Sequence, residues 1–270
     1  EILCRAGEAI GLVIERKGYY RLTRKGAVLI GLPGVTAMID HHKILYQDLL
    51  NPVDFFKGVE ETQLSRFWPY VFGGGMDLKS TEVEKYSDLM SESQHLVADD
   101  TLAAVNIPSV CRFLDVGGGK GTFVSELKKI YPKVDAAVFD LPGSHSENSG
   151  HRCIIGSFKE DKLPAGYDII SLVRILYDHR DETIRDLLGK AYSALDKGGR
   201  LIVSEPMLGA DRPTLWGDVY FAMYTLAMST GKTRSPDQLS QLIKDAGFSD
   251  VKIHKSARPF ITTVIEARKT

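Results

Sequence analysis

A run of glycines near the middle of the chain has the residue types and spacing of a cofactor-binding loop. The seven residues DVGGGKG (115–121) follow an apolar segment and precede one with helical spacing, which is the strand-to-helix context that nucleotide-binding loops require. Glycine lets the backbone turn sharply and approach a ligand closely, and the N–H groups at a helix start favour a negatively charged group. This loop is therefore predicted to hold a cofactor.

The glycine spacing distinguishes two classes of cofactor. A dinucleotide-binding loop reads G-x-G-x-x-G. Here Gly117 and Gly119 fit, but the third position falls on Thr122, and the last glycine, Gly121, comes one residue earlier. Together with Asp115, this D-x-G-x-G-x-G pattern favours S-adenosyl-L-methionine, a cofactor that carries a carboxylate and a ribose but no phosphate.

An acidic residue beyond the loop supports the same cofactor. Asp140 ends the next predicted strand, about 20 residues further on, where a carboxylate can accept hydrogen bonds from both ribose hydroxyls. The alternative is that Asp140 only caps a turn before Pro142. The loop and the acid together favour the ribose-binding role.

A second group of polar residues follows a later apolar strand. Tyr177, Asp178 and His179 stand in a row there, and the strand itself contains one charge, Arg174. A hydroxyl that accepts a methyl group must lose its proton, and histidine is the better base by its intrinsic pKa, about 6.5 against about 10 for tyrosine. The three residues either take part in catalysis or cap the following helix. Arg174 either reaches the cofactor cleft or pairs with an acid such as Asp161.

The segments around these residues alternate between strand and helix patterns, which predicts a parallel, doubly wound α/β sheet. An apparent antiparallel pair of strands closes the chain, as in a Rossmann-like methyltransferase sheet. The segment 141–150 is too short for an ordinary crossover helix, so either the crossover is degenerate or residues are absent from the sequence. The predicted strands cover 110–117, 135–140, 151–158, 167–176, 200–207, 250–257 and 260–268, and the predicted helices 121–131, 183–195 and 236–248.

The first part of the chain has a different pattern. Residues 1–31 predict a helix, a hairpin that turns at Lys17-Gly18, and a second helix, which is the tail of a winged helix. A winged helix either binds DNA or mediates dimerisation, and a net charge of −1 favours a homodimer over nucleic acid as partner. We therefore predict a helical, winged-helix-type dimerisation region in residues 1–100 and a cofactor-binding domain in residues 101–270.

Aromatic residues are concentrated in two helical stretches. Those in segment 55–72 either pack between helices or form an apolar wall for the acceptor. Segment 215–231 is apolar on nearly every side, which predicts a buried helix, and its methionines and aromatics could also line an apolar pocket.

Composition excludes several other functions. No apolar run approaches the roughly 18 residues needed to cross a bilayer, and the three cysteines show no metal-ligand spacing. We therefore predict a cytoplasmic protein without a metal site. The chain also lacks an initiator Met, so we expect residues before Glu1.

Several segments together resemble the plant-type small-molecule O-methyltransferases. The resemblance rests on "FLDVGGGKGTF", "VFDLPG", "GSF", "AGYDIISLVRILYDHRDE", "LDKGGRLIVSEPML" and the closing "AGF". The helical segments "MIDHHKILYQDLLNPVDFFKG", "SRFWPYVFG", "YSDLMSESQHLVADDTL" and "TLAMSTGKTRSPDQL" are most similar to the carotenoid branch of this family, the hydroxyneurosporene O-methyltransferases.

The resemblance implies a homodimer and methyl transfer to a hydroxyl. It also implies that Asp140 and Leu141 contact the ribose end of the cofactor and that Ser157 and Phe158 flank the adenine. Phenol-methylating relatives carry a histidine base where this chain has Tyr177. The plant mechanism therefore does not transfer directly, and we expect Tyr177 to orient the acceptor while His179 or Asp178 relays the proton.

Three hypotheses about function follow. The first is methylation of a hydroxyl on a hydrophobic acceptor, a 1-hydroxy carotenoid, which would reach the site through an apolar tunnel or from the face of the membrane. The second is methylation of a phenol or polyketide at the same cofactor site. The third is a non-catalytic dimer with a regulatory or scaffolding role, against which the intact glycine loop and Asp140 argue.

Overall fold

The protein is built around a seven-stranded sheet in the order β5-β4-β3-β6-β7-β9-β8. The computed structural model describes residues 1–31, 33–67, 93–142, 144 and 150–270. Strands β3 to β7 run parallel, whereas β9 is antiparallel to both of its neighbours. The predicted parallel sheet with a closing antiparallel pair is therefore confirmed. The strands are β3 Arg112–Val116, β4 Asp135–Asp140, β5 Arg152–Ile155, β6 Tyr167–Val173, β7 Leu195–Glu205, β8 Ser249–His254 and β9 Thr263–Arg268.

Helices cover both faces of the sheet, as the doubly wound prediction requires. Helix α8, Thr122–Ile130, and the helical residues 93–104 pack on one face. Helices α9, Asp181–Ala194, and α11, Pro236–Asp245, pack on the other. Alternate residues of each strand point to opposite faces, so Phe113 joins one core while its neighbour Leu114 joins the other.

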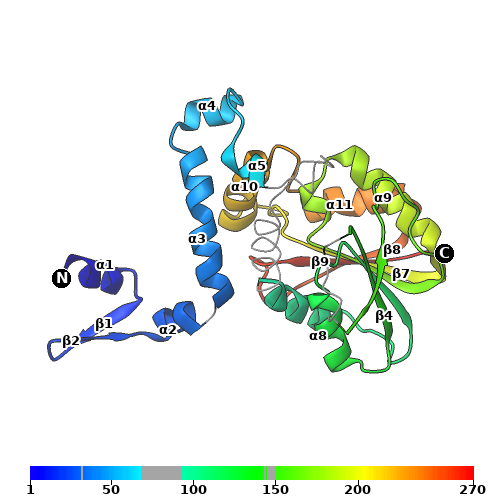
Figure 1. The fold of residues 1–270 in the computed structure, drawn as a ribbon, viewed down its shortest axis with the longest axis horizontal. Helices are drawn as coiled ribbons and strands as arrows, with labels where there is room; N and C mark the ends of the chain where they lie inside the picture. Colours follow the sequence, from blue (N-terminus) through cyan, green and yellow to red (C-terminus); the bar gives the residue numbers. More distant parts are fainter. Residues whose placement is uncertain (32, 68–92, 143, 145–149) are drawn as a thin grey trace.

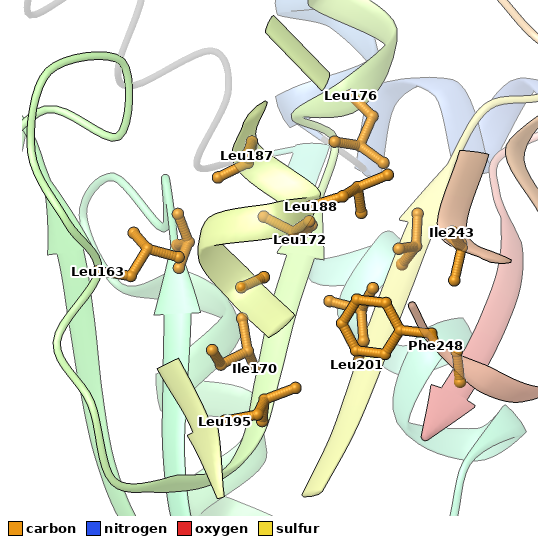
Figure 2. Close-up of a cluster of buried hydrophobic side chains, with 14 of the residues drawn as sticks. Leu163, Ile170, Leu172, Leu176, Leu187, Leu188, Leu195, Leu201, Ile243 and Phe248 are labelled. Atoms are coloured by element: carbon orange, nitrogen blue, oxygen red, sulfur yellow. The ribbon is translucent and has the colours of Figure 1, made fainter. Parts of the chain in front are cut away.

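The core under α9 and α11 is one continuous cluster of buried apolar side chains. Figure 2 shows Leu187 and Leu188 of α9 over Ile170 and Leu172 of β6, with Leu201 of β7 beside them. These side chains are fully buried. This packing holds α9 and α11 against the sheet, and the candidate site residues lie at the edge of that sheet.

The N-terminal segment forms a small unit of its own. Helix α1 is Ile2–Ala9, the strands β1 and β2 are Val13–Arg16 and Tyr19–Leu22, and helix α2 is Arg24–Gly31. These elements lie at the far end of the molecule from the sheet (Figure 1). The predicted helix, hairpin and helix are confirmed.

The next helices pack on an element from late in the chain. Helix α3, Pro33–Asp48, is followed by α4, Pro52–Lys57, and α5, Gln63–Phe67. They share a core with α10, Ala222–Met228, and the group lies between the N-terminal unit and the sheet (Figure 1). The residues of this cluster are Leu45, Phe55, Leu64, Tyr224, Ala227 and Met228.

The prediction of a helix buried on every side at 215–231 is partly wrong. Residues Leu215–Phe221 form a π-helix that leads into α10. One side of this segment packs against α3 and α5, but Leu215, Val219 and Leu226 on other sides are exposed. The segment therefore has more apolar side chains than its contacts with the other described elements bury.

Two predictions concern segments that lie wholly or partly outside the described residues. The short connection from β4 to β5 includes residues 143 and 145–149, which lie outside the described residues, so its crossover is not tested. Residues 68–72 of the aromatic segment 55–72 also lie outside them. The helical residues 93–104 run across the predicted domain boundary at 100/101, which stays a prediction.

We expect Leu187→Ala to lower the free energy of unfolding by about 2–5 kcal/mol, because it opens a cavity in a fully packed core. Urea denaturation would measure the change. Ile130→Ala is the matched control, since Ile130 is 56% exposed at the end of α8 and its truncation should cost within about 0.5 kcal/mol. Equal losses for the two variants would contradict this account of the core.

Candidate active site

The glycine loop joins β3 to α8 at the carboxyl edge of the sheet. Gly117, Gly119 and Gly121 have φ angles of 72°, 54° and 77°, a left-handed conformation that other residues adopt at a cost. A Cβ on Gly119 would meet no atom within 4 Å, so this part of the loop presents bare backbone to open space. A Cβ on Gly117 would collide with Ile175, which shows how closely the segment after β6 lies over the loop.

Asp140 lies directly beside the loop, as predicted. Its Oδ2 accepts a hydrogen bond of 2.6 Å from the N–H of Gly119, and its Oδ1 accepts one of 2.6 Å from the N–H of Leu141. Strand β4 pairs with β3 so that Phe139 faces Val116, which brings the two strand ends together. A carboxylate oxygen keeps a second lone pair after accepting one bond, so Asp140 can still bind hydroxyls.

Asp115 occupies a different position from the one expected of a direct cofactor ligand. It is buried beneath the loop, where Oδ1 accepts a hydrogen bond of 2.5 Å from the hydroxyl of Ser171. Its Oδ2 has no hydrogen-bond partner among the described residues and lies against Gly118. Burial raises the pKa of Asp115 to about 7, with the charge of Asp140 adding to the rise and the Ser171 bond opposing it. Its contact with the cofactor stays a prediction.

Ser157 and Phe158 follow β5 at the same edge of the sheet, because β5 pairs in parallel with β4 and places Ile155 opposite Asp140. The N–H of Ser157 donates a hydrogen bond of 2.8 Å to Asp161, so Asp161 has a local role in this turn. The ring of Phe158 packs edge-on against His179, with ring centroids 5.3 Å apart. The two residues predicted to flank the adenine thus lie after β5, two strands away from the glycine loop. One of them, Phe158, contributes an aromatic ring.

Tyr177 and Asp178 lie in a short 3-10 helix, Leu176–Asp178, after β6. Burial raises the pKa of Tyr177 far above its ordinary value, and the charge of Asp178 adds to the rise. Burial also raises the pKa of Asp178, with Glu205 contributing and with Arg174 and Tyr177 opposing the rise. Burial therefore disfavours the charged form of both groups.

Glu205 was not predicted as a site residue, yet it holds this segment in place. It ends β7, is fully buried, and its Oε1 accepts hydrogen bonds of 2.8 and 2.7 Å from the N–H groups of Ile175 and Leu176. Burial raises its pKa to about 8, although these backbone bonds and Arg174 oppose the rise. The sequence signal was an acid shortly after the apolar run Leu201–Val203.

Arg174 faces the tyrosines rather than the loop. It adopts a left-handed backbone with φ of 59°, and one guanidinium nitrogen donates a hydrogen bond of 2.7 Å to the hydroxyl of Ser93. Its charge lowers the pKa values of Tyr177, Tyr220 and Tyr224 against the effect of burial. Its charge also lowers the pKa values of Asp178 and Glu205, and the predicted pairing with an acid such as Asp161 stays a prediction.

His179 has different neighbours from Tyr177 and Asp178. Its ring packs on Phe158, and its carbonyl accepts a hydrogen bond of 2.9 Å from Arg234. Burial lowers its pKa to about 4, helped by the charges of Lys159 and Arg234. The structure thus brings Tyr177 and Asp178 together and sets the His179 ring toward the predicted adenine side.

Two histidine–tyrosine pairs join α3 to the π-helix and α10, and the sequence analysis did not predict them as site residues. His41 Nε2 is 2.8 Å from Tyr224 Oη, and His42 Nε2 is 2.7 Å from Tyr220 Oη. The histidines are adjacent on α3, and the tyrosines are four residues apart across the π-helix and α10. Two consecutive histidines on a helix with apolar neighbours were the only signal in the sequence, because their partners are more than 170 residues away.

The described residues contain no group of three or more His, Cys, Asp or Glu side chains that could hold a metal ion. None of the described helices is both long enough and apolar enough to span a membrane.

These features fit S-adenosylmethionine. The bare backbone at Gly119 leaves room for a ligand where a side chain would stand, and Asp140 offers acceptors beside it. Ile175, which lies over the loop, is followed by Tyr177, and the charge of Arg174 acts on Tyr177, Tyr220 and Tyr224.

The architecture defines the chain as a methyltransferase-like α/β protein. The structure of human N-acetylserotonin methyltransferase in complex with SAM aligns with a TM-score of 0.79 at 24% identity, covering 99% of this chain and 82% of that one. The pyocyanin biosynthetic protein PhzM aligns with a TM-score of 0.77 at 20% identity, covering 100% of this chain and 83% of that one. At these identities the likeness establishes the fold.

Sequence comparison gives the family. The family model of the O-methyltransferase domain matches residues 38–249. Demethylspheroidene O-methyltransferase of Rhodobacter capsulatus is 46% identical over 272 residues, 99% of this chain and 69% of that protein, and the protein of the same name from Cereibacter sphaeroides is 42% identical over 278 residues, 99% and 73%. The chain therefore belongs to the O-methyltransferase family, and the predictions of S-adenosylmethionine as cofactor and of methyl transfer to oxygen are confirmed.

We expect Asp140→Asn to weaken binding of S-adenosylmethionine by at least tenfold. The change removes the charge from a group that would accept ribose hydroxyls, and each charge-assisted hydrogen bond contributes about 1.5–3 kcal/mol. Isothermal titration calorimetry would measure the affinity. Asp135→Asn is the matched control, because Asp135 is exposed at the other end of the same strand. Equal affinities for the two variants would remove Asp140 from the cofactor site.

Proposed function

We propose that this enzyme methylates the hydroxyl of a hydrophobic acceptor, a 1-hydroxy carotenoid. The observation that carries the proposal is the 46% identity to demethylspheroidene O-methyltransferase over nearly the whole chain. The site supports it in one respect, because Tyr177 stands where phenol-methylating relatives carry a histidine. An acceptor without an acidic phenol group suits a site whose central side chain stays protonated.

Tyr177 is proposed to orient the acceptor. A buried hydroxyl that keeps its proton can donate one hydrogen bond and accept others, so it can hold an alcohol oxygen in line with the methyl group. Bound S-adenosylmethionine supplies an activated methyl group, so the protein mainly positions the nucleophile and excludes water. Arg174 supports this role, since its interaction with Tyr177 fixes the phenol ring on the acceptor side. The sequence suggests Asp178 or His179 as the group that receives the proton of the acceptor.

The N-terminal unit is proposed to be a winged-helix-type dimerisation region. Supporting this, it exposes large apolar side chains that an isolated chain would leave in water, which is typical of interaction surfaces. The near-neutral charge of the chain gives no advantage to a nucleic acid as the partner. The exposed side chains are Ile2, Leu3, Ile10, Leu22, Val28 and Ile30.

Delivery of a long apolar acceptor suggests a cytoplasmic enzyme with a peripheral contact at the membrane. In support, Leu215, Trp216 and Val219 in the π-helix are exposed, and Phe260 packs beside Trp216. Aromatic and aliphatic side chains of this kind partition into the interface of a bilayer. We propose this patch as the side from which the acceptor enters.

We expect the protein to methylate a 1-hydroxy carotenoid and to be inefficient with catechol and simple phenols. The reason is the absence of a histidine base at the position of Tyr177. Methyl transfer from labelled cofactor to each acceptor, in detergent micelles at saturating cofactor, would measure the preference. Ready methylation of catechol with no transfer to the hydroxy carotenoid would replace this proposal with a phenolic acceptor, and no transfer to either would favour a non-catalytic role.

We expect the protein to be a dimer in solution and Ile30→Glu to shift it toward the monomer, because a charge in an apolar interface is costly to bury. Light scattering after gel filtration would measure the mass. Ile130→Glu is the control, since this exposed residue lies on α8 outside the N-terminal unit. A wild-type monomer, or an unchanged dimer in Ile30→Glu, would refute the assignment of the interface.

A further inference from the structure

The proton released by the acceptor has no evident destination among the residues after β6. Tyr177 and Asp178 are both buried, and burial raises the pKa values of both groups and disfavours their charged forms. The pKa of His179 is lowered to about 4, so it holds a proton weakly, and its ring faces Phe158. A base with a defined route to the acceptor oxygen must therefore come from another element.

We propose that Tyr220 and His42 form the proton relay of this enzyme, with Tyr220 contacting the acceptor oxygen and His42 receiving the proton. The inference rests on the proposed function, because it concerns the hydroxyl acceptor of that same site. It assigns roles to two residues from opposite ends of the chain, α3 and the π-helix, that packing brings together.

The hydrogen bonds of His42 fix which nitrogen can act as a base. Its Nδ1 is 2.5 Å from the carbonyl oxygen of Met38. A carbonyl only accepts, so Nδ1 carries the proton of the neutral ring. The lone pair is therefore on Nε2, and the Tyr220 hydroxyl 2.7 Å away donates to it. A base held in one tautomer by a fixed partner is the arrangement by which enzymes activate hydroxyl groups.

Tyr220 in turn faces the centre at which the acceptor is proposed to lie. Its ring centroid is 4.7 Å from that of Phe221, and the ring of Phe221 lies edge-on to Tyr177 at 6.3 Å. The charge of Arg174 acts on both Tyr220 and Tyr177. Helix α10 contacts both α3 and the 3-10 helix that carries Tyr177. The His42–Tyr220 pair is therefore connected to Tyr177 through the ring of Phe221 and through the charge of Arg174.

The neighbouring pair is less suited to accept a proton. His41 and Tyr224 are both buried, and burial together with the charge of His42 lowers the pKa of His41 to about 4. His42 and Tyr220 are only half-buried, so an imidazolium at His42 can be partly hydrated. The buried pair instead belongs to the cluster that fixes α10 against α3.

The proposed step balances as follows. The acceptor oxygen forms a bond to the methyl carbon while the carbon–sulfur bond breaks and its electron pair goes to sulfur. The acceptor proton passes to Tyr220 Oη as the original Tyr220 proton passes to His42 Nε2. The products are the methyl ether, S-adenosylhomocysteine and an imidazolium whose Nδ1–H remains bonded to Met38. The proton then leaves to solvent from the half-exposed ring.

The test measures single-turnover methyl transfer at saturating cofactor for Tyr220→Phe, His42→Gln and the double variant. Glutamine can replace both hydrogen bonds of His42 but cannot take the proton, and phenylalanine preserves the ring packing of Tyr220. We expect each single variant to be slower by about 10²–10⁴-fold, and the double variant to be no slower than either, because the two residues act as one unit. Cofactor affinity should be unchanged in all three.

Chemical rescue separates a proton-relay role from a structural one. In His42→Ala, added imidazole should restore part of the rate, whereas in Tyr220→Phe it should not, because the hydroxyl link is missing. Lys43→Gln is the matched control on the same helix, since Lys43 is exposed and pairs only locally with Asp40. It should retain the wild-type rate.

Three results would overturn the relay. One is a wild-type rate in His42→Gln. Another is a double variant whose loss is the product of the single losses, with no rescue by imidazole. The third is a slower methyl transfer in His179→Ala and in none of the other variants. This result would make His179 the group that receives the proton. If the wild type methylates a phenol and not the alcohol, the acceptor proposal fails separately, and the same comparison on the phenol still decides the relay.

Discussion

The candidate site depends on one buried carboxyl group, that of Glu205. This side chain at the end of β7 accepts hydrogen bonds from two consecutive backbone N–H groups after β6. Those groups belong to the turn that places Ile175 over the glycine loop and leads into the 3-10 helix with Tyr177. Without an acceptor there, two buried donors would lose their partners, at about 1–3 kcal/mol each. The relative positions of the cofactor loop and the acceptor residues thus follow from one contact between neighbouring strands.

A second consequence of burial is that the charged forms of the acidic groups at this edge of the sheet are disfavoured. Burial raises the pKa values of both Asp178 and Glu205, and the charge of Glu205 raises the pKa of Asp178 further. Arg174 offsets only part of this effect. Burial thus favours the neutral, hydrogen-bonding forms of these carboxyl groups around the guanidinium of Arg174.

Sequence patterns predicted the local features well. The alternation of strands and helices, the left-handed glycines and the acid beside them are all set by neighbours within about 25 residues, and the structure has them where expected. What the sequence could not reveal were contacts between distant segments. His42 and Tyr220 are separated by 178 positions, and no periodicity links them. The exposure of Leu215 and Val219 was not predicted for the same reason. The apolar composition of a helix does not show how many of its sides pack against other elements.

The shared core of α3, α5 and α10 also bears on how the chain folds during synthesis. Leu45 and Leu64 leave the ribosome more than 150 residues before Tyr224 and Met228, the residues that cover them. At about 5–20 residues per second, these apolar side chains stay uncovered for roughly ten seconds or longer. In that interval they are available to chaperones or to another nascent chain. The packing of α3 and α5 on α10 is consequently among the last contacts to be assembled, well after the N-terminal hairpin can form.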